Sequence, residues 1–375
     1  MNYINLIDVC NINMGQSPDS KSYNDNCDGI PFFQGNADFG ERYPVTRVWC
    51  NAPTKIAKPN DILISVRAPI GALNFANEIC CIGRGLAAIT PDTRKVSVEF
   101  IYWLLKGKTA ELNSKGTGST FKAISRKVLE ETKVPDIPLD QQLGYAAVLE
   151  KIYAIITHRR QQLAKLDELV KARFVEMFGD VKTGVYKFET RKLGEVAVVG
   201  SSHRVFTTEF VENGVPFYRG TEIGELANGI KPENPYRITK EHYDRLASDE
   251  TKPQIGDLLM PSICNKGQVW MVDTNEPFYY KDGRVLCISP NRELFNCKYL
   301  EQFMREKTLV EYPKLGSGST FAEFKIFLLK DIDVLIPPIE LQDQFTAFVE
   351  QTDKSKFIAE IIITTIRRVR LYDQF

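Results

Sequence analysis

The chain has 375 residues, of which 43% are hydrophobic and 26% charged, and its 48 basic side chains balance 48 acidic ones. This is the composition of a globular protein with two or three domains, and a protein that held nucleic acid by phosphate contacts alone would usually be basic. Either the chain does not bind nucleic acid, or its positive charge is local, or partner chains supply the charge. No apolar run approaches the roughly 18 residues of a membrane helix and no signal peptide is recognisable, so we expect a cytoplasmic protein with no membrane contact.

The first half of the chain has the pattern of a mixed α/β body. Short apolar segments at 61–66 and 85–90 are bounded by Asp, Gly and Pro, which is typical of strands. Residues 98–116 form one amphipathic pattern that ends at a glycine, which predicts a single helix. The Gly-Thr-Gly-Ser-Thr segment from Gly116 can form either a helix cap with a turn or an anion-binding nest of hydroxyls and backbone amides.

A long helix is predicted after Pro138. Apolar or long side chains recur there at alternating spacings of three and four residues, which is a heptad seam interrupted by two arginines. A helix of roughly 30 to 38 residues would be on the order of 45–55 Å long. The seam residues are Leu149, Ile152, Ile156, Arg159, Leu163, Leu166, Val170, Arg173 and Met177.

The second half repeats the first. The hexapeptide Gly-x-Gly-Ser-Thr-Phe recurs from Gly316, 200 residues after Gly116, and Pro338 follows Pro138 at the same offset. Strand-like segments at 269–272 and 284–289, and a helical pattern at 297–316, come in the same order, so we predict a duplication in which a long helix follows each body. The matching segments are 29–40 and 214–225, 58–71 and 253–267, and 134–142 and 335–344, and the second seam holds Leu341, Phe345, Phe348, Thr352, Ser355, Ala359, Ile362, Ile366 and Val369.

The two long helices are expected to pair with each other. Neither seam is apolar enough to stand alone in water, and antiparallel pairing buries both, with one body near each end. The alternative is that each helix packs on its own body, but such a helix is longer than a body of about 140 residues with a radius of gyration of about 14 Å. The predicted divisions are 1–138 for the first body, 139–180 for the first long helix, 181–338 for the second body and 339–375 for the second long helix.

No catalytic or metal-binding pattern stands out. The eight cysteines form no Cys-x-x-Cys pair and the three histidines lie in unrelated contexts, which predicts reduced cysteines and no metal site. The triplet Glu323-Phe324-Lys325 has the spelling of a nuclease motif, but short acidic-lysine triplets also occur by chance. We therefore predict a chain with no catalytic residues and keep a metal-dependent nuclease as an alternative.

Polar and basic side chains on diverged loops are the candidate nucleic-acid contacts. Segment 106–127 carries six basic residues and one acid beside the Gly-Ser-Thr loop, which favours phosphate contact, although a basic run is usually a solvated face. Arg, Lys, Gln and Asn can also read base edges. The loops differ between the halves while the scaffold repeats, which indicates two readers of different sequences. The candidates are Gln34, Asn36, Arg67, Arg84, Lys115, Ser119 and Lys122 in the first body, and Arg219, Asn265, Lys266, Arg284 and Ser319 in the second.

This order of features resembles the specificity subunit of Type I restriction–modification enzymes. The resemblance rests on the Asp-Ile-Leu and Asp-Leu-Leu strands, the Gly-Ser-Thr-Phe loops, the Ile-Pro-Leu-Asp-Gln-Gln and Ile-Pro-Pro-Ile-Glu-Leu-Gln segments, and the long helix after each, and it covers essentially the whole chain. It implies a mixed α/β (α+β) fold with two tandem target recognition domains separated by a long antiparallel two-helix coiled coil, related by a pseudo-two-fold axis. The second helix departs from that symmetry because it lacks a counterpart of residues 169–180.

The resemblance also implies a function. Each domain would read one half of a split, asymmetric site in double-stranded DNA, and the paired helices would set the gap. Two methylation subunits would hold S-adenosylmethionine and carry the adenine-N6 chemistry, and restriction subunits would use ATP and Mg²⁺, so no cofactor is expected in this chain. The alternatives are the DNA-reading subunit of a Type II-like restriction system with differently arranged catalytic chains, and a coiled-coil scaffold that binds only protein.

Overall fold

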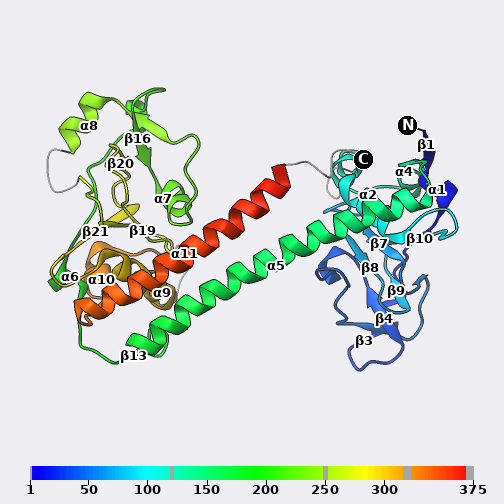
Figure 1. Ribbon diagram of the computed structural model, residues 1–375, viewed down its shortest axis with the longest axis horizontal. Helices are drawn as coiled ribbons and strands as arrows, with labels where there is room; N and C mark the ends of the chain where they lie inside the picture. Colours follow the sequence, from blue (N-terminus) through cyan, green and yellow to red (C-terminus); the bar gives the residue numbers. More distant parts are fainter. Residues whose placement is uncertain (1, 119–121, 248–251, 316–321, 369–375) are drawn as a thin grey trace. The chain divides into compact units, whose positions relative to one another are not determined.

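The computed structural model describes residues 2–118, 122–247, 252–315 and 322–368 (Figure 1). The chain divides into two compact units, Met1–Gln161 with Ala359–Phe375, and Gln162–Ile358. Both units combine sheets with helices, so the predicted mixed α/β class is confirmed. The finer division into four segments at 138, 180 and 338 stays a prediction.

The first unit is built on an antiparallel four-stranded sheet with the strand order β2-β10-β7-β8. The apolar segment predicted at 61–66 forms β7, and all four of its residues are buried because both faces of the strand are covered. Ile62 and Ile64 share a core with the helices, and Leu63 packs on a second, mixed sheet with the order β3-β5-β4-β9-β6. The strands are β1 (Tyr3–Asn5), β2 (Cys10–Met14), β3 (Tyr23–Asn24), β4 (Ile30–Phe33), β5 (Trp49–Cys50), β6 (Ile56–Ala57), β7 (Ile62–Ser65), β8 (Leu73–Phe75), β9 (Cys80–Ile82), β10 (Leu86–Pro91) and β11 (Lys133–Pro135), and β1 pairs with β11.

The predicted single helix over 98–116 is wrong, because the structure has two helices there, α2 (Val98–Gly107) and α3 (Thr109–Ser114). Lys108 separates them, since its backbone leaves the helical conformation with ψ at 6°. The apolar side of α2 lies in the core of the first unit, which is the amphipathic packing that the pattern indicated. The other short helices of this unit are α1 (Leu6–Val9), α4 (Arg126–Glu130) and the 3₁₀ turns η1 (Ser20–Ser22) and η2 (Asn36–Asp38).

The second unit repeats the topology of the first. Its antiparallel sheet has the order β15-β21-β18-β19, its strands β14 and β22 pair as β1 and β11 do, and β16 runs parallel to β20 as β4 runs parallel to β9. This correspondence of strand order confirms the duplication. The strands are β12 (Gly179–Asp180), β13 (Val185–Tyr186), β14 (Thr190–Lys192), β15 (Ala197–Gly200), β16 (Val215–Tyr218), β17 (Tyr236–Ile238), β18 (Leu258–Pro261), β19 (Trp270–Met271), β20 (Tyr279–Tyr280), β21 (Val285–Pro290) and β22 (Asp333–Leu335).

The helix predicted at 297–316 is present in the second unit as α9 (Cys297–Glu311), followed by the 3₁₀ turn η4 (Tyr312–Leu315). Asn296 caps α9, because its side-chain oxygen accepts hydrogen bonds from the amides of Lys298 and Tyr299. The buried face of α9 then packs on the sheet through Tyr299 and Phe303. The remaining short helices are α6 (Leu193–Val196), α7 (Gly220–Leu226), α8 (Lys240–Leu246), α10 (Ile326–Lys330) and η3 (Thr207–Glu209).

Two long helices follow the bodies, α5 (Leu139–Phe178) and α11 (Ile339–Arg368) (Figure 1). Within the second unit, Asp167 of α5 forms an ion pair with Lys356 of α11 at 2.7 Å, and Phe174 lies edge-on to Phe345 with 5.4 Å between ring centroids. Residue numbers rise along one helix as they fall along the other, so the predicted antiparallel pairing is confirmed in this unit. All described seam residues are buried or partly buried; Val369 lies outside the described residues.

The ends of α5 also pack on the bodies, as the alternative proposed. Leu149 belongs to the core of the first unit, and Phe174 and Phe178 belong to the core of the second. The helix therefore uses its apolar side chains both for the seam and for the two cores. No helix within the described residues is long and apolar enough to cross a membrane.

Candidate functional site

Four of the predicted contact residues meet at one concave surface of the first unit. Gln34 and Asn36 come from the loop after β4, Arg67 from the loop after β7, and Arg84 from the turn before β10. The cavity has a volume of about 420 Å³. Its lining is Gln34, Gly35, Asn36, Ala37, Asp38, Ser65, Arg67, Ala68, Pro69, Arg84 and Gly85.

The loop after β4 is held by one carboxylate. Oδ2 of Asp38 accepts hydrogen bonds from the backbone amides of Gln34 at 2.7 Å and Gly35 at 3.2 Å. The negative charge of Asp38 is therefore directed at backbone donors, and the side chain of Gln34 is left exposed at the rim. Sequence alone gave no sign of this role for Asp38.

Gly85 joins the two walls of the cavity. Its amide donates to the carbonyl oxygen of Gln34 at 3.1 Å, and its own carbonyl oxygen accepts from the amide of Val66 at 2.9 Å. A Cβ atom at position 85 would lie 2.4 Å from the Gln34 oxygen, which is closer than real Cβ atoms approach. A residue without a side chain is thus required where the loops that carry Gln34 and Arg67 come together.

The segment that returns from the Gly-Ser-Thr loop forms a border of the same site. The amide of Ala68 donates to the carbonyl oxygen of Lys122 at 3.1 Å, and that of Ile124 donates to Val66 at 2.9 Å. Lys122 is exposed beside Arg67. Lys115, by contrast, forms an ion pair with Glu111 at 2.6 Å, and Ser119 lies outside the described residues.

The first unit therefore presents three exposed cations together: Arg67, Arg84 and Lys122. None of the three has an acidic partner among the residues that the structure describes. Guanidinium groups can donate two hydrogen bonds to a phosphate or to guanine O6 and N7, and the side-chain amides of Gln34 and Asn36 suit adenine. This chemistry fits a surface that accepts an anionic polymer with hydrogen-bonding edges.

The corresponding candidates of the second unit are arranged differently. Arg219 donates to the carboxylate of Glu222, with its Nη2 2.7 Å from Oε1, and its guanidinium lies 4.6 Å from the ring centroid of Tyr236. Arg284 forms an ion pair with Glu323 at 2.7 Å. Asn265 and Lys266 are exposed on the loop after β18, and Ser319 lies outside the described residues.

Glu323 and Lys325, the pair behind the nuclease alternative, form an ion pair with each other. The hydrogen bond from Lys325 lowers the pKa of the Glu323 carboxyl, and Arg284 adds to that effect. No group of three or more His, Cys, Asp or Glu side chains is placed to hold a metal ion within the described ranges. The Glu323 carboxylate is thus paired with two cations, Lys325 and Arg284.

A buried glutamine at the start of each long helix was missed in the sequence. Oε1 of Gln142 accepts from the amide of Ser97 at 2.9 Å, and its Nε2 donates to the carbonyl oxygens of Ile137 at 2.9 Å and Lys95 at 3.2 Å. Ser97 is the residue that caps α2, so Gln142 fastens the long helix to the body.

Gln342 makes the same three bonds in the second unit. It accepts from the amide of Asn296, the α9 cap, at 2.9 Å, and donates to Leu294 at 2.9 Å and Pro337 at 2.8 Å. The signal in the sequence was the 200-residue offset, which pairs Gln142 with Gln342 as it pairs Pro138 with Pro338, but it does not indicate that these side chains are buried.

A second repeated feature is an aspartate whose carboxylate stabilises the turn before β7 or β18. In the first unit Asp61 accepts from the amide of Lys58 at 2.8 Å and from the hydroxyl of Thr90 at 2.7 Å. In the second, Asp257 accepts from the amide of Gln254 at 2.8 Å and also forms an ion pair with Arg292 at 2.7 Å.

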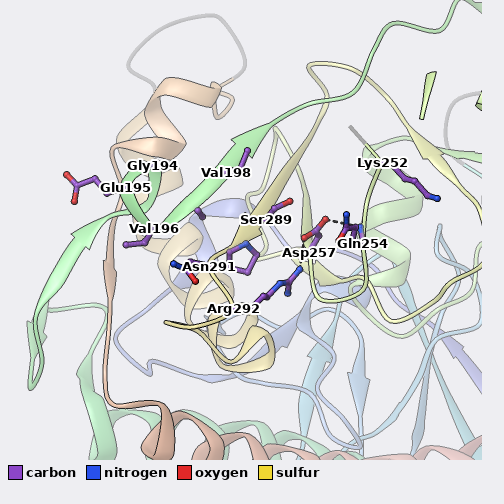
Figure 2. A pocket seen from close by; sticks show the side chains of 12 residues that line it. Gly194, Glu195, Val196, Val198, Lys252, Gln254, Asp257, Ser289, Asn291 and Arg292 are labelled. Atoms are coloured by element: carbon purple, nitrogen blue, oxygen red, sulfur yellow. Dashed lines mark hydrogen bonds and ion pairs between the residues drawn. The ribbon is translucent and has the colours of Figure 1, made fainter. Parts of the chain in front are cut away.

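Figure 2 shows Asp257 and Arg292 among the residues that line a cavity of about 630 Å³ in the second unit. Burial raises the pKa of the Asp257 carboxyl, against the opposing hydrogen bonds from the Gln254 amide and the Ser289 side chain and the charge of Arg292. Because Asp61 accepts the same backbone hydrogen bond in the first unit, a buried aspartate at this turn has a structural role in both copies of the duplication.

Several known proteins are similar to this chain in sequence. Residues 1–168 match the family model of the type I restriction modification DNA specificity domain. A chain of Methanocaldococcus jannaschii named as the MjaX type I restriction enzyme specificity subunit is 42% identical over 158 residues, covering 42% of this chain and 37% of that relative. The MjaIX specificity subunit of the same organism is 23% identical over 356 residues, covering 88% of this chain and 79% of that relative.

A solved structure shares the architecture over nearly the whole chain. The S subunit of a type I restriction-modification system from M. genitalium superposes with a TM-score of 0.60 at 13% identity, covering 99% of this chain and 95% of that one. The fold is thus a duplicated mixed α/β chain, and its first 168 residues match the type I DNA specificity domain. The match to the MjaX subunit spans little more than a third of that relative's length.

Proposed function

We propose that this chain is the DNA-reading subunit of a type I restriction–modification complex. The observation that carries the proposal is the convergence of Gln34, Asn36, Arg67 and Arg84 at one cavity, with both arginines exposed and without acidic partners among the described residues. Fixed loops that present unpaired guanidinium and amide groups have the donor chemistry for reading base edges in the major groove.

The two units read different halves of a split site. The loop after β7 in the first unit carries Arg67, whereas the loop after β18 in the second carries Asn265 and Lys266, so the donors differ while the sheets repeat. The long helices α5 and α11 set the separation of the half-sites, because a helix is a rigid element with a rise of about 1.5 Å per residue.

The chemistry of the complex lies in partner chains. Two methylation subunits bind S-adenosylmethionine and methylate adenine at N6, and restriction subunits use ATP and Mg²⁺ for translocation and cleavage. The chain itself contributes recognition and no catalytic residue. The pairing of Glu323 with Lys325 and Arg284 supports this role over that of a metal-dependent nuclease.

The test is to co-express the chain with a methylation subunit and to map methylated adenines in the host genome. The expected result is one split motif with two unlike halves and a fixed gap. A stable complex that methylates no such motif would refute this reading. In parallel, binding of the full chain to duplex DNA over a salt series should show a negative slope of about 0.9 per phosphate contact in a double-logarithmic plot. A flat salt dependence would favour a scaffold that binds only protein.

A further inference from the structure

The two units differ in whether the cations of their recognition loops form ion pairs with acidic side chains. The exposed cations of the first unit, Arg67, Arg84 and Lys122, have no acidic partner among the described residues. In the second unit the cations at the corresponding border are Arg284 and Lys325, and both pair with the single carboxylate of Glu323. The difference lies in which residues occupy equivalent positions, and the hydrogen-bond register establishes those positions.

Arg284 is the structural counterpart of Gly85. The amide of Val66 donates to the carbonyl oxygen of Gly85 at 2.9 Å, and the amide of Ser262 donates to that of Arg284 at 2.9 Å. The strand register agrees, because Leu86 lies opposite Ser65 and Val285 lies opposite Pro261. The duplication thus places a long cation where the first unit has the glycine that joins the cavity walls.

Glu323 is the counterpart of Ala123 by the same argument. The amide of Ile124 donates to Val66 at 2.9 Å, and the amide of Phe324 donates to Ser262 at 2.7 Å, so the residues that precede them correspond. The first unit therefore has a small apolar side chain at the point where the second unit has a carboxylate.

We infer that Glu323 is a specificity-determining residue of the second unit, which occupies Arg284 and Lys325 in the free protein and so suppresses sequence-independent binding to DNA phosphates. The inference rests on the proposed DNA-reading function. Arg284 and Lys325 are more than half exposed, so solvent and DNA can reach them, whereas the Glu323 side chain is only 20% exposed and remains between them.

The physical basis is an exchange of anions. A phosphate that approaches Arg284 must displace Glu323 and is repelled by the charge of that carboxylate. A phosphate contact that does not depend on the DNA sequence therefore adds little binding free energy. The carboxyl stays ionised at neutral pH, because Lys325 and Arg284 lower its pKa. Only a DNA half-site that also satisfies the other donors of the unit compensates for the lost ion pair.

The test measures binding of the full chain to a random-sequence duplex by fluorescence anisotropy over a salt series. Glu323→Ala copies the residue of the first unit at this position. At 0.1 M salt, each additional phosphate contact that a freed cation makes should raise the affinity for DNA about eightfold. It should also steepen the double-logarithmic salt dependence by about 0.9. Glu323→Gln, which keeps the shape of the side chain, should have the same direction of effect.

The matched control is Glu306→Gln, which changes net charge by the same amount in the same unit and removes an ion pair with Lys171 at 3.0 Å. We expect it to leave affinity within twofold of the unmodified chain. The double variant Glu323→Ala with Arg284→Ala should lose most of the gain. Equal affinities for Glu323→Ala and Glu306→Gln would overturn the inference.

The outcomes separate the inference from the proposed function. If Arg67→Ala weakens binding while Glu323→Ala leaves it unchanged, the chain reads DNA but Glu323 is not a determinant. If the unmodified chain and every variant fail to bind duplex DNA at low salt, the proposed function fails and the inference falls with it. A gain for Glu323→Ala that disappears with Arg284→Ala supports both.

Discussion

The buried glutamine at the start of each long helix should be among the most sensitive polar positions of the chain. Gln142→Ala removes three hydrogen bonds, one to the amide of Ser97 and two to the carbonyl oxygens of Ile137 and Lys95, at a site that is 2% exposed. The Ser97 amide is buried, so the substitution leaves it without an acceptor. The part-buried carbonyl oxygens of Ile137 and Lys95 lose their donor.

The expected cost follows from these bonds. A hydrogen bond contributes about 1 kcal/mol net, and an unsatisfied buried group costs about 1–3 kcal/mol, so three such losses lower the free energy of unfolding by about 3 kcal/mol or more. In a unit of this size, Met1–Gln161 with Ala359–Phe375, this corresponds to a fall of about 6–12 °C in the melting temperature. Gln342→Ala should cost a similar amount, because Gln342 also accepts from one backbone amide and donates to two backbone carbonyl oxygens.

The assay combines urea unfolding with amide hydrogen exchange. Gln141→Ala is the matched control, since Gln141 is the adjacent residue on the same helix and is exposed. Exchange at the Ser97 amide should accelerate in Gln142→Ala and not in Gln141→Ala, because only the former removes its acceptor. If the two variants have unfolding free energies within about 0.5 kcal/mol of each other, the account of this joint is refuted.

Three further outcomes are expected. Arg67→Ala should weaken recognition at one half-site only, by about 1–3 kcal/mol, as read from methylation of single-base variants of the site, and equal loss at both halves would contradict separate readers. Gly85→Ala should destabilise the first unit and distort its cavity, because a Cβ atom there lies 2.4 Å from a backbone oxygen. Gly35→Ala is the control and should be tolerated, because open space surrounds a Cβ atom at that position, and thermal melting compares the two variants. A thiol reagent at pH 8 should label exposed Cys27 and spare Cys10, since burial raises the pKa of the Cys10 thiol to about 12, and rapid labelling of Cys10 in the folded chain would contradict this.

The Cys10 thiol also predicts a direction for alkaline stability. Burial, with a smaller contribution from the charge of Asp92, raises the pKa of this thiol from 9.0 to about 12 in the folded chain. The folded state therefore binds more protons than the unfolded state between these values, and this contribution to stability is present below pH 9 and lost as pH rises toward 12.

Much of the architecture could be predicted from the sequence because it depends on local patterns. The strand at 61–66 is a short apolar run between turn residues, and α5 has a seam of regular three- and four-residue spacing, so both follow from local patterns in the sequence. The break at Lys108 could not be predicted in this way, because α2 and α3 continue the same amphipathic pattern on either side of it.

In the candidate site, too, local sequence patterns indicate the residue types but not the contacts between residues that are distant in the sequence. The four residues of the first cavity were selected by chemistry, and the structure brings them together. The ion pair of Arg284 with Glu323 joins residues 39 positions apart, and no local pattern encodes it. The repeated spelling Gly-Arg at 83–84 and 283–284 even suggests that Arg84 and Arg284 correspond, whereas the register aligns Arg284 with Gly85.

In each unit a strand from the start of the body, β1 or β14, pairs with the strand just before a long helix. Tyr3 lies opposite Pro135 in β1 and β11, and Thr190 lies opposite Leu335 in β14 and β22. A ribosome adds about 5–20 residues per second, so β1 waits roughly 7 to 26 seconds for its partner.

Bringing together two strands separated by roughly 130 residues costs about 4 kcal/mol in loop-closure entropy. Pairing with β11 offsets this cost only after β11 has been synthesised. By then β14 and β22 do not yet exist, so β1 pairs with β11 before a duplicate strand can compete. Synthesis from one end thus protects a duplicated chain from exchanging strands between its copies during folding.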